Sequence, residues 1–254
     1  MSNSSQSNRI VSLYPLTKFY ISVAFVVIGM VMPSLVSKLV CFVLVNVLAV
    51  ASGVWPVFIR RVRNSVGALF ALLVLIQMFF GTGEHIIFSF WIFNAKWEGL
   101  MFALNLGLIL MCVGGSLIWF FAVTKEKDFV LSLEKAGMSP KATYVILSTL
   151  QMVPVLKKKS DTIMNAQRAR GVETEGSLMV RAKVFVPTLV PLVLSSISGT
   201  EERALTLEAR GFSSESQRTH LEDIERTSAD RTVMILTTIL FVAAIAGGIA
   251  LWVI

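Results

Sequence analysis

The sequence predicts an all-α membrane protein with about five transmembrane helices and a separate charged domain of two long amphipathic helices. The 254 residues are 55% hydrophobic and only 15% charged, with a mean hydropathy of +0.73, whereas soluble domains carry about 25% charged residues. Charge is concentrated in residues 125–231, which hold 16 of the 23 Lys and Arg and 14 of the 16 Asp and Glu. Within that stretch the tripeptide Ala-Arg-Gly occurs twice.

Five uncharged apolar runs are long enough to cross a bilayer, which takes about 20 largely apolar residues. They are residues 19–37, 39–59, 65–83, 99–124 and 233–254. The predicted organisation is therefore an N-terminus (1–18), a membrane domain with four spans (19–124), the charged block (125–231) and a final transmembrane helix (232–254). No small-residue cleavage signature follows the first run closely, so we expect an uncleaved first span.

Two further apolar runs are weaker candidates. Residues 85–95 are too few to cross, and we expect a re-entrant or interfacial segment with Trp91 and Trp97 at headgroup depth. Residues 184–200 contain two prolines and three serines. We therefore expect this second run to belong to the charged block.

Orientation follows from the positively charged loops. Arg60, Arg61 and Arg63 stand between the second and third runs and predict a cytoplasmic loop, whereas the next loop has a net charge of −1. The N-terminus and residues 125–231 are then cytoplasmic, and the C-terminus is outside a plasma or inner membrane. If residues 184–200 crossed the membrane, the two Ala-Arg-Gly copies would face opposite compartments, which is implausible for a repeated motif.

The repeat extends beyond the two tripeptides, Ala169-Arg170-Gly171 and Ala209-Arg210-Gly211, which are 40 residues apart. At the same offset Ser160-Asp161 matches Thr200-Glu201, Val172 matches Phe212, and Glu175 matches Glu215.

An amphipathic pattern precedes each copy, with apolar residues at spacings of three and four. One face of the first helix comprises Met152, Leu156, Ile163 and Gln167, and the matching face of the second comprises Leu189, Val193, Ile197, Thr200, Ala204 and Leu207. Proline suits a first helical turn. We therefore expect the first helix to begin near Pro154 and the second near Pro187 or Pro191.

Each tripeptide predicts the C-terminus of a helix. Glycine at that point adopts the left-handed conformation that ends a helix, and the preceding arginine interacts favourably with the helix dipole. A well-capped helix would explain one copy, but a cap does not require arginine twice. Arginine on a rigid helix tip can make a bidentate contact with a carboxylate. Two such tips predict two equivalent or pseudo-equivalent receiving subunits.

These residues resemble the T component of energy-coupling factor (ECF) transporters, the CbiQ-like transmembrane family, over nearly the whole chain. The resemblance is carried by Pro15-Leu16-Thr17-Lys18, Val153-Pro154, Ala166-Gln167-Arg168-Ala169-Arg170-Gly171, Pro191, Arg203-Ala204 and Glu208-Ala209-Arg210-Gly211-Phe212. Two departures are Tyr14, where the family has an acidic residue, and Thr206-Leu207, where it often has Ala-Met.

The resemblance implies a non-catalytic coupling subunit of a four-part importer for a vitamin or a transition-metal ion, with residues 125–231 as the cytoplasmic coupling domain. Two ATPase subunits would receive the helix ends at Ala169, Arg170, Gly171, Ala209, Arg210 and Gly211. A substrate-binding membrane subunit would rest on Met152, Leu156, Ile163, Leu189, Val193 and Ile197. ATP binding would move the two helices relative to each other and reorient that subunit.

A self-contained secondary transporter is the main alternative. Such proteins usually carry ionisable residues or broken helices at the membrane midplane. The five predicted spans contain no Asp, Glu, Lys, Arg or His, and polar residues such as Asn46, Gln77 and Asn105 are typical of helix packing. The pattern therefore favours a subunit whose substrate is handled elsewhere.

A membrane-embedded enzyme is the second alternative. Glu84-His85 is the one acid–imidazole pair near a span, and adjacent helical residues point apart; His220 fits a solvated linker. No phosphate-binding Gly-x-x-x-x-Gly-Lys-Ser/Thr loop is present. Cys41 and Cys112 lie in apolar runs without a Cys/His pattern. We therefore predict no catalytic residue, metal site or cofactor, and the charged block, at only +2, predicts no nucleic-acid partner.

Overall fold

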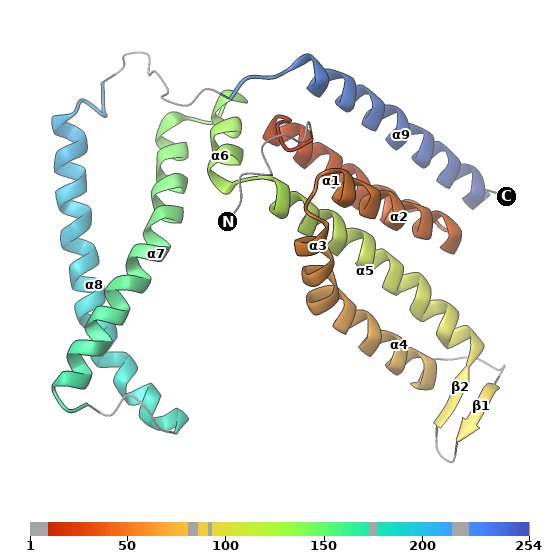
Figure 1. The fold of residues 1–254 in the computed structure, drawn as a ribbon, viewed down its shortest axis with the longest axis horizontal. Helices are drawn as coiled ribbons and strands as arrows, with labels where there is room; N and C mark the ends of the chain where they lie inside the picture. Colours follow the sequence, from red (N-terminus) through yellow and green to blue (C-terminus); the bar gives the residue numbers. More distant parts are fainter. Residues whose placement is uncertain (1–9, 81–85, 91–92, 173–176, 215–223, 254) are drawn as a thin grey trace. The chain divides into compact units, whose positions relative to one another are not determined.

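The computed structural model describes residues 10–80, 86–90, 93–172, 177–214 and 224–253 (Figure 1). The regular secondary structure of this part of the chain is helical except for one antiparallel hairpin, formed by β1 (Ile86–Phe90) and β2 (Phe93–Lys96). The chain divides into two compact units. We call Met1–Gly137 with Ile224–Ile254 the membrane unit, and Met138–Asp223 the helix-pair unit.

The helices of the membrane unit confirm an all-α membrane protein. They are α1 (Pro15–Val31), α2 (Leu35–Ala51), α3 (Trp55–Val62), a π-helical turn η2 (Arg63–Gly67), α4 (Ala68–Phe80), α5 (Trp97–Val123), α6 (Glu126–Lys135) and α9 (Ser228–Val253). Within the described residues, three helices are long and apolar enough to cross a membrane: Trp55–Phe80, Trp97–Val123 and Ser228–Gly248. Two shorter apolar helices, α1 and α2, have 17 residues each.

The predicted end of the first span was wrong. The apolar run 19–37 extends across a break, because α1 ends at Val31 and α2 begins at Leu35. Met32 is extended, with φ −66° and ψ 121°, since the residue before a proline avoids the helical region. Lys38, expected between two spans, consequently lies in the first turn of α2.

The predicted loop carrying Arg60, Arg61 and Arg63 was also wrong. α2 ends at Ala51, where Gly53 has φ 70° and the Val54 N–H donates to Ala49 O at 3.2 Å. A new helix starts at Trp55, with proline in its first turn. The three arginines therefore lie in the first turns of the continuous helix Trp55–Phe80, where long side chains can still reach water.

α5 is the central helix of the membrane unit and packs against α1, α2, α3 and α4. Close approach of α5 to α4 and to the preceding turn η2 depends on small residues, as in other membrane helix pairs. A Cβ added at Gly107 would lie 2.3 Å from the Phe70 ring, and one at Gly114 would lie 2.5 Å from Val66. The buried apolar core is Ile21, Phe25, Ile28, Cys41, Val45, Ala49, Phe58, Val62, Cys112, Trp119, Phe120 and Val123.

A buried polar contact joins the starts of α1 and α9. The Asp230 carboxylate, only 2% exposed, accepts the Tyr14 N–H at 2.7 Å and the Thr227 N–H at 2.8 Å. The Tyr14 hydroxyl donates to Ser132 O in α6 at 3.2 Å. α9 thus places a carboxylate at the start of α1.

The chain leaves and re-enters the membrane unit at one point. Lys135, near the end of α6, donates from Nζ to Ile224 O at 2.8 Å. This bond joins the segment before the helix-pair unit to the segment after it. The unit boundaries, Met138 and Asp223, lie within the predicted block 125–231, and α6 is part of the membrane unit.

The helix-pair unit contains α7 (Pro140–Ala169) and α8 (Leu178–Ala209). Both begin earlier than predicted: Pro154 lies inside α7, and Pro187 and Pro191 lie inside α8. α7 starts where Ser139 caps it, since the Ser139 hydroxyl accepts the Ala142 N–H at 3.3 Å and Pro140 follows at the first helical position.

α7 and α8 cross as an antiparallel pair (Figure 1). Near the crossing, Lys159 Nζ donates to the hydroxyl and the carbonyl of Ser195, at 2.9 and 3.3 Å. The ring of Tyr144, near the start of α7, lies 4.9 Å from the ring of Phe212, just after α8. α8 contains the run 184–200.

Several sequence predictions concern residues outside the described ranges. These residues are Glu84, His85, Trp91, Glu175, Glu215 and His220. Trp97 is described: it is 48% exposed at the start of α5.

Candidate functional site

The first Ala-Arg-Gly copy ends α7 in a Schellman motif. Gly171 has φ 83°, and its N–H donates to Arg168 O at 2.9 Å. The Val172 N–H donates to Gln167 O at 3.1 Å. These two bonds are the pair that closes a helix when the residue after the cap is left-handed.

The second copy repeats this geometry at the end of α8. Gly211 has φ 73°, its N–H donates to Glu208 O at 2.9 Å, and the Phe212 N–H donates to Leu207 O at 2.9 Å. The predicted helix ends are therefore confirmed at both copies. The bonds fix the preceding residue, Arg170 or Arg210, as the C-cap of its helix.

Both arginine side chains are exposed. In the described parts of the chain, neither guanidinium has a hydrogen-bond or ion-pair partner. The antiparallel pairing puts them at opposite ends of the helix-pair unit. Arg170 lies 11 residues beyond Lys159 and Arg210 lies 15 residues beyond Ser195, or about 16 and 22 Å along the two helix axes. Each tip is thus available to a different partner molecule.

The surroundings of the two arginines differ in charge. Arg168 stands two residues before Arg170 at the first tip. At the same repeat position the second tip has Glu208, whose carboxylate accepts the Ser213 hydroxyl at 2.7 Å. Glu201 and Glu202 stand one to two turns earlier. The charged neighbour two residues before the arginine is therefore basic at the first tip and acidic at the second.

The six apolar residues predicted to support a substrate-binding subunit do not all line the same groove. Leu156, Val193 and Ile197 line one groove of about 440 Å³ between α7 and α8. Val193 and Ile197 are 51% and 53% exposed. Met152, Ile163 and Leu189 are half-buried on the same two helices and do not line this groove.

The exposed apolar surface of the helix pair is larger than the sequence pattern predicted. It also includes Val145 and Val153 on α7 and Phe185, Val186, Val190 and Leu194 on α8. The sequence repeat could have indicated Val153, because Val153 matches the predicted surface residue Val193 at the repeat offset of 40. Exposed apolar side chains that gather into one patch are typical of an interaction site, so these residues are candidates for a docking surface.

Replacing either glycine with alanine is expected to loosen the corresponding helix end. Nothing lies within 4 Å of a Cβ added at Gly171, so the cost is that of a left-handed L-residue, about 1–2 kcal/mol. Amide exchange should accelerate about tenfold at Val172 in Gly171→Ala and at Phe212 in Gly211→Ala. Gly247→Ala is the control, since Gly247 also has open space around it but no positive φ. Unchanged exchange at both amides would contradict the role of the left-handed glycines.

No group of three His, Cys, Asp or Glu in the described ranges could hold a metal ion. Cys41 and Cys112 are free and buried in the core of the membrane unit, on α2 and α5.

Comparison with known proteins gives consistent matches over most of the chain. Residues 6–221 match the CbiQ family model, described as "Cobalt transport protein". The chain is 28% identical over 243 residues to the energy-coupling factor transporter transmembrane protein EcfT of Lactococcus lactis subsp. cremoris, covering 91% of this chain and 90% of that protein. It is 30% identical over 198 residues to EcfT of Brevibacillus brevis, covering 73% of each. EcfT of Thermosediminibacter oceani is 27% identical over 242 residues, with 92% and 91% covered.

Proposed function

The chain belongs to the CbiQ family and is a transmembrane component of an ECF transporter, and we propose that it couples two partner ATPase subunits to a substrate-binding membrane subunit. In this role the chain is not itself an enzyme. ATP hydrolysis occurs on the partner ATPases, and the chain transmits their motion without binding nucleotide.

The repeated arginine tip is the observation that carries this proposal. Two helix ends have the same closing hydrogen bonds, the same exposed arginine and opposite positions on one antiparallel pair. One ATPase subunit would receive Ala169, Arg170 and Gly171, and the other Ala209, Arg210 and Gly211. A bidentate arginine–carboxylate contact gives both affinity and a defined orientation. Because the tips are rigid, movement of either ATPase would be transmitted along the attached helix.

The exposed apolar surface of the helix pair supports the second half of the proposal. The groove lined by Leu156, Val193 and Ile197 lies between α7 and α8, so its shape changes when the helices move relative to each other. A substrate-binding subunit resting there, and on the neighbouring Met152, Ile163 and Leu189, would feel that movement. Residues 125–231 would then be the cytoplasmic coupling domain of a plasma-membrane protein.

The proposed cargo is a micronutrient, either a vitamin or a transition-metal ion, which binds to the partner subunit. Three relatives are named as ECF transporter transmembrane proteins, and the family model is described as a cobalt transport protein. These descriptions support micronutrient import as the class of transport.

Reconstitution tests the proposal. The purified chain alone in lipid vesicles should show no solute uptake with or without ATP. Affinity purification from native membranes should recover ATPase and small membrane subunits, and vesicles containing the complete set should take up solute only with ATP. Uptake driven by an ion gradient in vesicles that contain this chain alone would instead establish a self-contained secondary transporter.

A further inference from the structure

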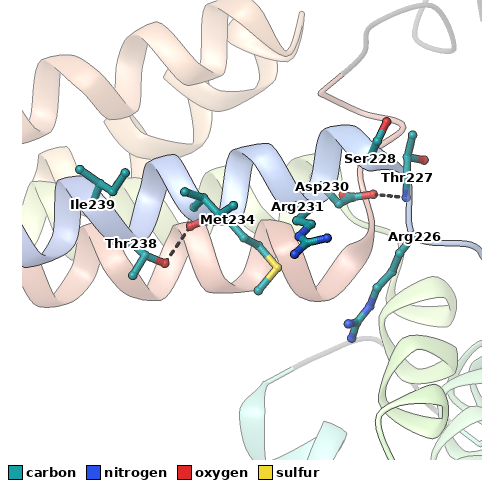
Figure 2. Close-up of a pocket in the computed structure, with 9 residues that line it drawn as sticks. Arg226, Thr227, Ser228, Asp230, Arg231, Met234, Thr238 and Ile239 are labelled. Carbon is teal, nitrogen blue, oxygen red and sulfur yellow. Dashed lines mark hydrogen bonds between the residues drawn. The ribbon is translucent and has the colours of Figure 1, made fainter.

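A groove of about 690 Å³ runs along the first turns of α9 (Figure 2). Its polar end is lined by Arg226 and Arg231, and its apolar end by Met234, Ile235 and Ile239. α9 begins at Ser228 and is one of the helices apolar enough to cross a membrane. The groove therefore runs from the membrane–water boundary into the apolar layer.

The carboxylate in the groove wall lowers the net positive charge there but forms no direct ion pair with either arginine among the described residues. Asp230 already accepts two backbone N–H groups, from Tyr14 and Thr227, and is 2% exposed. The Arg226 guanidinium lies 5.0 Å from the centre of the Tyr14 ring, a cation–π contact that leaves its N–H donors available. Arg231 is exposed and has no ion-pair or hydrogen-bond partner among the residues that the structure describes. Two guanidinium groups consequently remain to bind an anion.

The apolar end selects an amphipathic ligand. Ile235 and Ile239 are 52% and 61% exposed and lie one turn apart on the same face. The Thr238 hydroxyl, also in the groove wall, is already in hydrogen-bonding contact with the Tyr20 hydroxyl at 3.0 Å and bonds Met234 O at 2.8 Å. The apolar part of the groove thus offers mainly hydrocarbon surface, which suits an acyl chain.

We propose that this groove binds one anionic phospholipid, with its phosphate between Arg226 and Arg231 and an acyl chain along Met234, Ile235 and Ile239. Guanidinium pairs with phosphate bidentately, and basic residues at a membrane surface attract anionic lipids. The lipid would occupy the leaflet at which α9 begins. The site is independent of the arginine tips of the helix-pair unit.

Native mass spectrometry of the purified full chain tests this proposal, with detergent micelles containing equal phosphatidylglycerol and phosphatidylcholine. The wild type should retain one phosphatidylglycerol in preference to phosphatidylcholine. Arg231→Gln should reduce that preference about fivefold, and Arg231→Lys should reduce it less, because it keeps the charge. Arg61→Gln is the matched control: Arg61 is also exposed, near the start of another spanning helix and outside the groove.

A second variant tests the apolar end without changing charge. Ile235→Trp should fill the groove and lower retention of both lipids while leaving Arg231 in place. Equal loss of preference in Arg61→Gln and Arg231→Gln would overturn the proposal, because it would show a general effect of surface charge. Displacement of phosphatidylglycerol by millimolar glycerol 3-phosphate would also overturn it, since the headgroup alone would then be the ligand.

Discussion

Changing both Arg170 and Arg210 to glutamate is expected to abolish ATP-driven uptake and to separate the chain from its ATPase subunits. Each change replaces a cation at a rigid helix tip with an anion facing the carboxylate that it would bind, and losing a charge-assisted contact costs about 2–5 kcal/mol. The loss of both contacts should lower the binding free energy enough to separate the subunits. Co-purification of the ATPases and uptake by the reconstituted complex measure the effect.

The single variants should differ in severity. Arg170→Glu leaves the basic Arg168 beside the first tip, whereas Arg210→Glu leaves the acidic Glu208 beside the second. Arg210→Glu should therefore cause the larger loss of co-purification.

The control for the double variant is Lys157→Glu with Lys158→Glu, which makes the same change in net charge at exposed positions of α7. This control should retain uptake. Full uptake by the Arg170→Glu, Arg210→Glu chain would remove the basis for the coupling role.

The second large effect is expected at Asp230. Asp230→Ala leaves the buried N–H groups of Tyr14 and Thr227 without their acceptor, so the free energy of unfolding should fall by about 3 kcal/mol. Asp230→Asn should cause a smaller loss, since its amide oxygen can still accept one of the two bonds. Denaturant titration of the purified chain in detergent measures both values.

Glu225→Gln is the matched control for Asp230. Glu225 is an exposed carboxylate five residues earlier, and its change should alter stability by no more than about 0.5 kcal/mol. If Asp230→Ala unfolds at the same denaturant concentration as Glu225→Gln, the buried carboxylate does not hold the starts of α1 and α9 together.

The helix tips could be predicted from the sequence because their cause is local. A left-handed glycine ends a helix through hydrogen bonds to carbonyl groups only a few residues earlier in the chain. Gly171 and Gly211 were therefore predicted correctly. The helix starts were not. Proline is tolerated inside a helix at a cost of about 3 kcal/mol, and packing can offset that cost, so Pro154 did not mark the start of α7.

Other features depend on contacts between distant residues. Tyr14 and Asp230 are 216 residues apart, and no pattern along the chain predicts their bond. The break between α1 and α2 was missed because the apolar runs considered were defined by the absence of charge, and Pro33 carries none. Arg60, Arg61 and Arg63 were assigned to a loop because charged residues were taken to lie outside the helix. A helix can instead start in the aqueous or headgroup layer, where long arginine side chains reach water.

In the proposed coupling role, the crossing of α7 and α8 would act as a pivot with two arms of unequal length. Because the arms are about 16 and 22 Å long, a rotation of about 10° around the Lys159–Ser195 contact would move Arg170 by about 3 Å and Arg210 by about 4 Å. Such a rotation would also shift the ring of Phe212 against that of Tyr144, since these two rings join the end of α8 to the start of α7. The groove lined by Leu156 and Val193 lies near the pivot, so its width would change by much less than the positions of the tips.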